Sequence, residues 1–280
     1  MWKQKLGVSV SKQFSLPPAE LMTLLREVGF HAISPRWYEG YPMEETAIAC
    51  QKEGLAIQSL HAPFQKANLL WNDKEEDSAI PLHDLMGTLE DCRRYDVPVM
   101  VAHAWITFDY DQVPNEAGFR NFDRVVEQAE KWGVKLALEN TEGREFLDAL
   151  MERYENTDTV GFCWDSGHEI CYNHNEDMLA LYGKKLYMTH LNDNVGIRSL
   201  EGIISPYDDA HLLPYDGIAD WDEKIARLKR APRQEILNLE INNFSRSGRH
   251  DNDRYGKMTL EEYFTEAYLR ACRIALRYHQ

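Results

Sequence analysis

Seven short apolar runs in the sequence each lead into a carboxylate or an imidazole. The runs are AIQSLHAP, VPVMVAHAW, VKLALEN, VGFCWDSGH, KLYMTHLND, the irregular PYDDAHLLPYDG and EILNLEIN. The polar residues that they present are His61, His103, Glu139, Asp165 with His168, His190, Asp209 with His211, and Glu240. Mixed carboxylates and imidazoles suit a borderline divalent cation such as Zn²⁺ or Mn²⁺, whereas an all-oxygen set would favour Mg²⁺ or Ca²⁺. The pattern predicts a metal site if the fold brings these positions together.

The elements that must position these residues alternate along the chain. Apolar, β-branched runs indicate strands near residues 6–10, 31–35, 56–61, 97–104, 134–140, 160–165, 185–191 and 235–241. Most are almost continuously apolar, which is typical of parallel strands buried on both faces. Helical patterns follow them at residues 17–29, 43–54, 78–96, 116–133, 145–154, 176–183, 220–231 and 259–279. The last pattern begins with Thr259 and Glu262 at the spacing of a capping box.

Eight strand–helix pairs predict an α/β protein that forms a single (β/α)8 TIM barrel over residues 1–280. A doubly wound open sheet is the alternative, but it calls for fewer strands or a phosphate-binding GxGxxG, which the sequence lacks. The active site of a barrel lies at the C-terminal ends of its strands, where all of the polar residues above are expected. The long irregular connection at residues 193–220 also indicates function, because such loops are otherwise uncommon.

Each polar residue, taken alone, also has a structural explanation. A histidine at a strand end is often simply hydrogen-bonded, and DSGH around Asp165 and His168 is good turn chemistry. Asp209 could cap a turn. Salt bridges could explain Glu139 and Glu240, but the strands offer few basic partners, and an unpaired buried carboxylate is costly. Their common position at one end of the barrel favours the metal site.

Composition limits the class of partner. The formal charge is −15, from 31 basic and 46 acidic residues, and a surface this acidic disfavours nucleic acid. The five cysteines form no CxxC, so a disulfide framework is not expected and a reducing cytoplasm fits best. The N-terminal apolar run is too short for a signal peptide, and no stretch approaches the length of a membrane span. We therefore expect a cytoplasmic protein that does not bind membranes.

Several of these motifs resemble those of a known group. LALENT, CWDSGHE, THLNDN, DAHLLPYDGIADW and LNLEI are similar to motifs of the xylose-isomerase-like TIM-barrel superfamily. That superfamily contains sugar isomerases and sugar phosphate epimerases, and also the type-IV apurinic endonucleases of AP endonuclease family 2. The resemblance runs from HAP at 61–63 to LNLEIN at 237–242.

The resemblance implies two ligand sets. In the epimerase branch one metal is held by two glutamates, an aspartate and a histidine, and a histidine three residues after the aspartate, here His168, contacts substrate. The positions that match these four ligands are Glu139, Asp165, His190 and Glu240. In the endonuclease branch a cluster of three zinc ions also uses His168 and recruits further ligands. The positions similar to those are His61, His103, Asp209 and His211.

Two features depart from the family pattern. The family loop commonly reads HxxPGxG, whereas this chain reads HLLPYDG, with Tyr215 in place of the first glycine. Many epimerases of the family carry an arginine after the seventh strand that grips substrate hydroxyls. Arg198 is the nearby candidate.

These considerations predict a divalent-metal-dependent sugar or polyol isomerase or epimerase that transfers protons through an enediolate. Glu139 and Glu240 would be metal ligands and the acid/base pair, with Zn or Mn as the cofactor. Trp37, Phe64 and Trp105 could stack on the carbon face of a sugar, or could simply pack the barrel.

Two alternatives stay open at this point. A zinc-dependent phosphodiester hydrolase is favoured by the additional histidines and disfavoured by the acidic charge. A catalytically silent barrel that binds a metal or a sugar would have little use for two glutamates at the barrel mouth. The amphipathic C-terminal helix could also serve a homo-oligomer interface.

Overall fold

A ring of parallel strands forms the centre of the protein. The computed structural model describes residues 4–108 and 112–280. Its strands are β1 (Lys5–Val10), β2 (Ala32–Pro35), β3 (Ala56–Ile57), β4 (Ser59–His61), β5 (Val99–His103), β6 (Lys135–Glu139), β7 (Val160–Asp165), β8 (Leu186–His190) and β9 (Ile236–Leu239). Every predicted strand is therefore present, with bounds that differ by a few residues.

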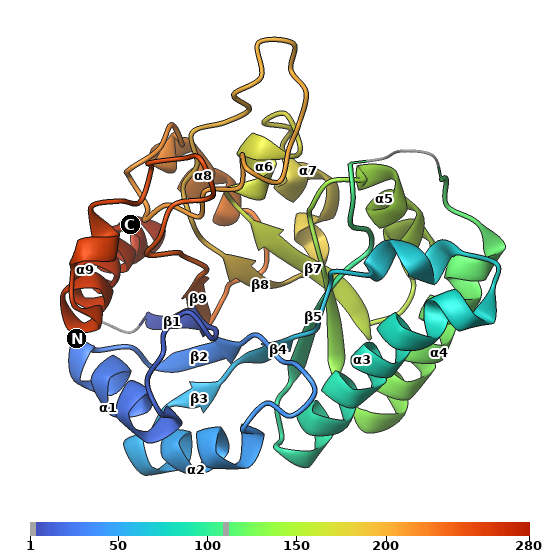
Figure 1. Ribbon diagram of the computed structural model, residues 1–280, viewed down its shortest axis with the longest axis horizontal. Helices are drawn as coiled ribbons and strands as arrows, with labels where there is room; N and C mark the ends of the chain where they lie inside the picture. Colours follow the sequence, from blue (N-terminus) through green and yellow to red (C-terminus); the bar gives the residue numbers. More distant parts are fainter. Residues whose placement is uncertain (1–3, 109–111) are drawn as a thin grey trace.

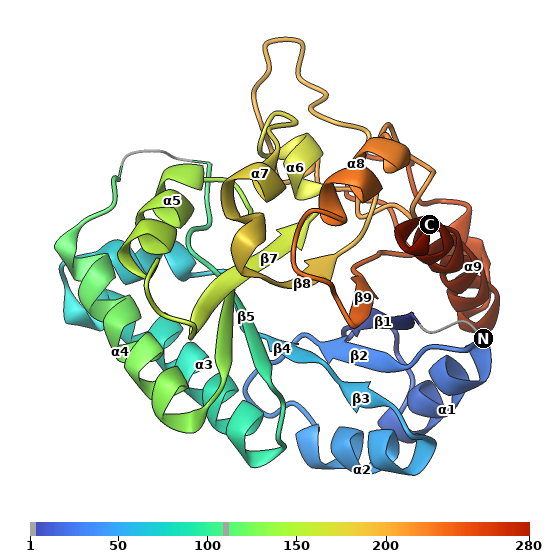
Figure 2. The same ribbon diagram turned by 180° about the vertical axis from the view of Figure 1, so that it is seen from behind.

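The strands hydrogen-bond in two parallel arcs, which are joined into a barrel. One arc has the order β3-β2-β1-β9 and the other has the order β4-β5-β6-β7-β8. Parallel bridges close the ring at both seams, between Arg36 and His61 and between Leu191 and Leu239. The view in Figure 1 shows the strands converging in the centre with helices outside them, and Figure 2 shows the same ring from behind. The predicted TIM barrel is confirmed.

Helices cover the outside of the ring. They are α1 (Pro18–Val28), α2 (Met43–Glu53), α3 (Glu75–Arg94), α4 (Glu116–Trp132), α5 (Arg144–Arg153), α6 (His168–Cys171), α7 (Met178–Tyr182), α8 (Trp221–Leu228) and α9 (Leu260–His279), with short 3-10 turns at Ala67–Trp71, Gly183–Lys185 and Tyr255–Lys257. The capping box predicted at the start of α9 is present, because Thr259 and Glu262 each accept a hydrogen bond from the other's backbone N–H. In both views α9 lies beside α1, so the last helix closes the ring against the first.

Two predicted elements differ in detail. The expected strand at 56–61 is divided at Gln58 into β3 and β4, because the chain changes partner there from β2 to β5. Helix α3 begins at Glu75 rather than at Ser78, so that Pro81 lies inside it. Acidic side chains in that first turn, which includes Glu75 and Asp77, favour the earlier start because they face the positive end of the helix dipole.

Two layers of packing set the direction of the strand ends. A large apolar core lies between strands and helices, and a small cluster fills the inside of the ring. The small cluster consists of Val99, Val101, Ala137, Cys163 and Met188. Side chains on a strand alternate between its faces, so the residues two positions after these also point inward. Those next inward positions are His103, Glu139, Asp165 and His190.

Two long loops surround the barrel mouth, and we call them the mouth loops. They comprise residues 191–220, after β8, and residues 240–259, after β9. The first one contains the part of the chain that projects at the top of Figure 1. Four ion pairs join the two loops: Arg198–Asp251, Arg246–Asp209, Arg249–Asp208 and Arg254–Asp216. The predicted irregular connection is therefore present, and ion pairs hold it against the loop after β9.

Other expectations concern surfaces. Among the residues that the structure describes, no helix combines the length and the apolarity needed to cross a bilayer. Helix α9 buries one face, including Tyr263 and Phe264, and leaves Leu269 and Leu276 exposed on another. An oligomer interface on α9 stays a prediction.

Asp216 is a mouth-loop carboxylate whose ion pairs make stability depend on pH. Burial raises the pKa of the Asp216 carboxyl, but hydrogen bonds from Arg254, Tyr255 and Arg270 outweigh burial and hold that pKa below its ordinary value of 3.8. Because the pKa is depressed in the folded state, the stabilisation is complete above the unfolded-state pKa and is lost as pH falls through the folded-state pKa. We expect Asp216→Asn to lower the free energy of unfolding by about 2 kcal/mol at pH 7.

Urea unfolding at pH 7 and near pH 3.5 measures this difference. The gap between wild type and Asp216→Asn should narrow at the lower pH, because the Asp216 carboxyl of the unfolded chain binds a proton there more readily than the folded one does. Asp73→Asn is the control, because Asp73 is exposed in the loop before α3. A gap that is equal at both pH values would contradict this account of Asp216.

Candidate metal centre and cavity

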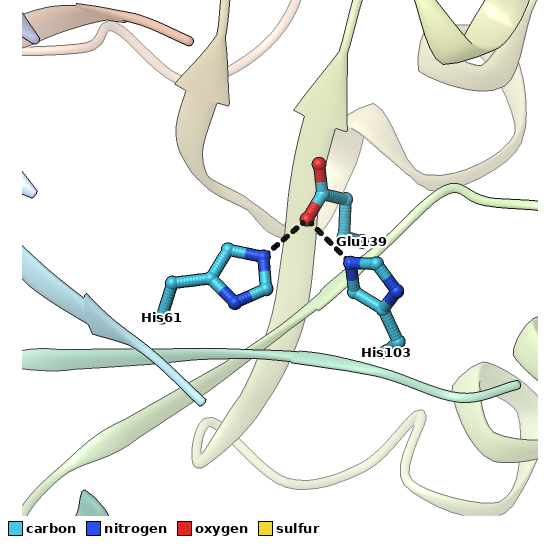
Figure 3. Close-up of side chains that lie close together, drawn as sticks. All are labelled: His61, His103 and Glu139. Carbon is cyan, nitrogen blue, oxygen red and sulfur yellow. Dashed lines mark hydrogen bonds and ion pairs between the residues drawn. The ribbon is translucent and has the colours of Figure 1, made fainter. Parts of the chain in front are cut away.

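Glu139, at the end of β6, is the most heavily contacted carboxylate of the barrel mouth. Its Oε2 lies 3.1 Å from His61 Nε2 and 3.2 Å from His103 Nε2. Figure 3 shows the two imidazoles pointing at the same carboxylate oxygen. Its Oε1 lies 2.9 Å from His190 Nδ1. The residue is buried, so these imidazoles replace the water that a carboxylate normally binds.

Glu240, the residue directly after β9, faces Glu139 across His190. Its Oε2 lies 2.8 Å from His190 Nδ1. Its Oε1 accepts hydrogen bonds from Arg36 Nε at 3.2 Å and from Arg36 Nη2 at 2.7 Å. The two glutamates therefore contact the same imidazole nitrogen, and a guanidinium holds the outer side of Glu240.

Asp165, at the end of β7, is held from behind by backbone and amide groups. Its Oδ1 accepts from the backbone N–H groups of Gly167 at 2.8 Å and of His168 at 2.6 Å. Its Oδ2 accepts from Asn192 Nδ2 at 2.7 Å. The DSGH segment is therefore a turn that leads into α6, and that turn fixes the direction of the Asp165 carboxylate.

The four residues of the predicted core ligand set come together. One ligand atom from each of Glu139, Asp165, His190 and Glu240 lies within 4.8 Å of the others, and all four side chains are buried. Three carboxylates at that separation and away from water repel one another strongly, and a dication among them would remove the repulsion. The chemistry of this donor set therefore fits a divalent metal.

The pKa values reflect this crowding. Burial raises the pKa of Glu139, but the charge of His190 and a hydrogen bond from His103 overcome burial and hold it well below the ordinary value. Burial also raises the pKa of Glu240, but the charges of His190 and Arg36 hold it well below its ordinary value. The pKa of Asp165 is raised by burial and by the charges of both glutamates, although His168 opposes the shift. Burial lowers the pKa of His103 to about 4.

The residues that resemble the additional ligands of the endonuclease branch also lie at the barrel mouth. His168 Nε2 and His211 Nδ1 lie 3.5 Å and 2.6 Å from Asp209 Oδ1, and His211 Nε2 lies 3.5 Å from Glu240 Oε2. Arg246 forms an ion pair with the other oxygen of Asp209. Ligand-type atoms of His61, His103 and Glu139 form one further group, and those of Asp165, His168 and His211 form another.

Two neighbouring pockets open at these residues, and we call them the inner lobe and the outer lobe. The inner lobe, of about 140 Å³, is lined by residues that include His61, Glu139, His168 and Glu240. The outer lobe, of about 370 Å³, lies towards the loops after β1, β2 and β4. Arg36, His61 and Phe64 line both lobes, so the two lobes share a wall.

The predicted pocket residues differ in how they relate to the two lobes. Phe64 lies in the cavity, with its ring 4.4 Å from that of His103. Trp37 lines the outer lobe but is largely buried, and its indole N–H donates to Asp91 at 2.7 Å. Trp105 is fully buried and stacks on Phe146 at 3.9 Å, outside both lobes. It is therefore packing rather than a sugar platform.

Arg198 and Tyr215 also lie outside the two lobes. Arg198 pairs with Asp251 in the other mouth loop, so the structure does not bring it to the core ligands. Tyr215 adopts φ 74°, a backbone conformation that favours the glycine of the family pattern. Its ring lies against Trp221 and beneath the guanidinium of Arg273, away from the cavity.

Several cavity residues were not predicted from the sequence. They are Arg36, Ile106, Phe108, Glu142, Tyr172, Pro206 and Arg246. Arg36 lies where the predicted site residues lie, because it is the polar residue that directly follows the apolar run 31–35. A pattern of metal-ligand types does not select it, because an arginine is not a metal ligand. Glu142 and Tyr172 lie in loops or short turns, where no periodic pattern marks direction.

Comparison with known proteins agrees with this architecture. Residues 22–262 match the family model described as xylose isomerase-like TIM barrel, and the chain belongs to that family. The uncharacterized protein y4fM of Sinorhizobium fredii is 30% identical, over 91% of this chain and 86% of its own length.

Two solved structures share the fold at low identity. One is the IolI protein with a bound zinc atom, with a TM-score of 0.74 and 20% identity over 97% of this chain and 98% of that one. The other is the 3-keto-D-glucoside 4-epimerase YcjR of E. coli, with a TM-score of 0.70 and 16% identity over 96% and 100%.

Gly167 offers a test of the support behind Asp165. A Cβ on Gly167 would lie 1.8 Å from Asn192 Oδ1, while its φ of −84° and ψ of −40° suit alanine. Gly167→Ala must therefore displace the Asn192 amide that holds Asp165. We expect the affinity for Zn²⁺ to fall about tenfold to a hundredfold, as for other losses of support to a ligand, measured by competition with a chelator.

Gly183→Ala is the matched control for this variant. Gly183 also has a helical backbone, and its nearest neighbour to a new Cβ is Leu179 at 3.5 Å. Thermal unfolding of both variants separates a folding defect from a site defect. Unchanged zinc affinity in folded Gly167→Ala protein would show that Asn192 does not support a metal ligand.

Proposed function

We propose that this protein is a divalent-metal-dependent isomerase or epimerase that acts on a sugar or polyol. The reaction would be proton transfer beside a carbonyl through an enediolate. The observation that supports it is the pair Glu139 and Glu240, which approach His190 Nδ1 from different strands at 2.9 Å and 2.8 Å. Two carboxylates that line the same small lobe suit removal of a proton by one and its return by the other.

The residues that would hold the metal are Glu139, Asp165, His190 and Glu240. The zinc atom of the IolI structure makes Zn²⁺ the first candidate, and Mn²⁺ suits the same donors. When bound, such a cation would polarise the carbonyl and the neighbouring hydroxyl and stabilise the enediolate charge. The neighbouring 3-keto-D-glucoside 4-epimerase supports a carbonyl-containing sugar as substrate class.

The surrounding side chains have separate tasks in this proposal. Arg36 keeps Glu240 ionised and oriented, so that it can accept a proton. His61 and His103 fix the second oxygen of Glu139. Phe64 presents an apolar face at the lobe wall, where the carbon face of a sugar can pack.

The variant Glu240→Gln tests the acid/base role. Gln keeps the shape but cannot take up a proton, so we expect turnover of the sugar substrate to fall about a thousandfold. Activity is measured at saturating metal, with metal content determined on the same sample. Glu235→Gln is the control, because Glu235 is an exposed residue just before the same strand and pairs only with Lys5 among the described residues. Full activity of Glu240→Gln would refute the role.

A phosphodiester hydrolase is the second candidate. The observation that favours it is the presence of His61, His103, Asp209 and His211 around the same cavity, where they could bind further ions. The charge of −15 weighs against a nucleic-acid substrate. Arg246 pairs with one oxygen of Asp209, so only the other oxygen, Oδ1, would be available to a further ion.

Metal counting separates the two candidates. The isomerase account predicts one tightly bound ion per chain by elemental analysis and no cleavage of DNA that contains an abasic site. Three zinc ions per chain together with such cleavage would support the hydrolase instead. His211→Ala should leave the count at one in the first case and lower it in the second.

A further inference from the structure

The outer lobe differs in charge from the rest of this acidic protein. Its charged lining residues include Lys12 and Arg36, and no aspartate or glutamate lines it among the residues that the structure describes. The inner lobe, in contrast, is lined by several carboxylates. In a chain with 46 acidic and 31 basic residues, a cavity lined in this way is a local positive region.

Lys12, in the loop after β1, contacts an aromatic ring in this lobe. Its Nζ lies 3.5 Å from the centre of the Tyr38 ring. The described part of the chain gives Lys12 no carboxylate partner within ion-pair distance. A cation–π contact leaves the ammonium able to accept an anion as well, because an exposed contact of this kind is weak. The Lys12 ammonium can therefore bind an anion that enters the lobe.

Arg36 connects this lobe to the carboxylates of the inner lobe. A guanidinium has five N–H donors, and Arg36 uses Nε and Nη2 on Glu240 Oε1. The remaining donors lie on a side chain that is 32% exposed and lines both lobes. The side-chain amides of Gln13 and Gln65 add further polar groups to the lining.

We propose that the outer lobe binds an anionic group of the substrate, the phosphate or the carboxylate of an acidic ketose. The carbonyl end of the same molecule would occupy the inner lobe beside Glu139 and Glu240. Arg36, His61 and Phe64 line both lobes, so the lobes are adjacent, and one extended molecule would pass these three side chains to occupy both. The inference rests on the proposed sugar isomerase and specifies its substrate class.

Binding of three related ketoses tests the inference. D-Fructose, D-fructose 6-phosphate and D-fructuronate are titrated into metal-loaded protein by calorimetry at fixed ionic strength. We expect at least one of the two acidic ketoses to bind about tenfold more tightly than fructose. Lys12→Gln should remove most of that gain in affinity, while the affinity for fructose stays constant. A gain for the phosphate ester alone identifies a sugar phosphate, and a gain for fructuronate identifies a sugar acid.

Lys66→Gln is the matched control for charge. Lys66 is exposed in the loop after β4, near the outer lobe, but does not line it. The inference is overturned if neither acid binds more tightly than fructose, if the gain survives Lys12→Gln, or if Lys66→Gln removes it equally.

Turnover of the same ketoses is followed separately. Turnover of a neutral ketose with no gain for the acids contradicts the anion site but not the proposed function. Binding of an acid that depends on Lys12, without turnover of any ketose, contradicts the isomerase and leaves the anion site in place.

Discussion

The repulsion among three buried carboxylates is the constraint on which the barrel mouth depends. Glu139, Asp165 and Glu240 converge within 4.8 Å on His190, where little water can reach them. Charge at that density is tolerated only with counter-charge and with hydrogen bonds. His190 and Arg36 supply part of it from the protein. A divalent cation would supply the rest, which links the stability of the site to its chemistry.

The turn after β7 shows how the fold opposes this repulsion. Glu169, beside His168, points away from the cavity and accepts from Lys224 Nζ at 2.7 Å and from Arg227 Nη2 at 2.6 Å. Lys224 also donates to the backbone carbonyl of Ser166 at 3.1 Å. These buried contacts tie helix α8 to the turn that carries Asp165. The contacts behind the turn therefore help to fix the direction of a candidate metal ligand.

The sequence predicts strand ends better than it predicts side-chain directions. Glu139 and His190 could be found because each ends a buried apolar strand, and the barrel brings all such ends together. Trp105 also follows a strand, but its ring turns outward and packs on Phe146, which strand periodicity does not decide beyond the last residue. Arg36 also follows an apolar run, but its part in the site depends on Glu240, which lies 204 residues away in the sequence. Arg198 sits in a loop whose course depends on ion pairs with Asp251 that no local pattern reveals.

The central claim is that the two glutamates move a proton beside a carbonyl. Hydrogen exchange into substrate tests it most directly: metal-loaded protein is incubated in D2O with neutral and acidic ketoses, and the products are examined by NMR. The account predicts solvent deuterium on a carbon next to the carbonyl, at a rate that is lost when the metal is removed. Absence of deuterium from every ketose, in a preparation that instead cleaves DNA at abasic sites, would contradict it.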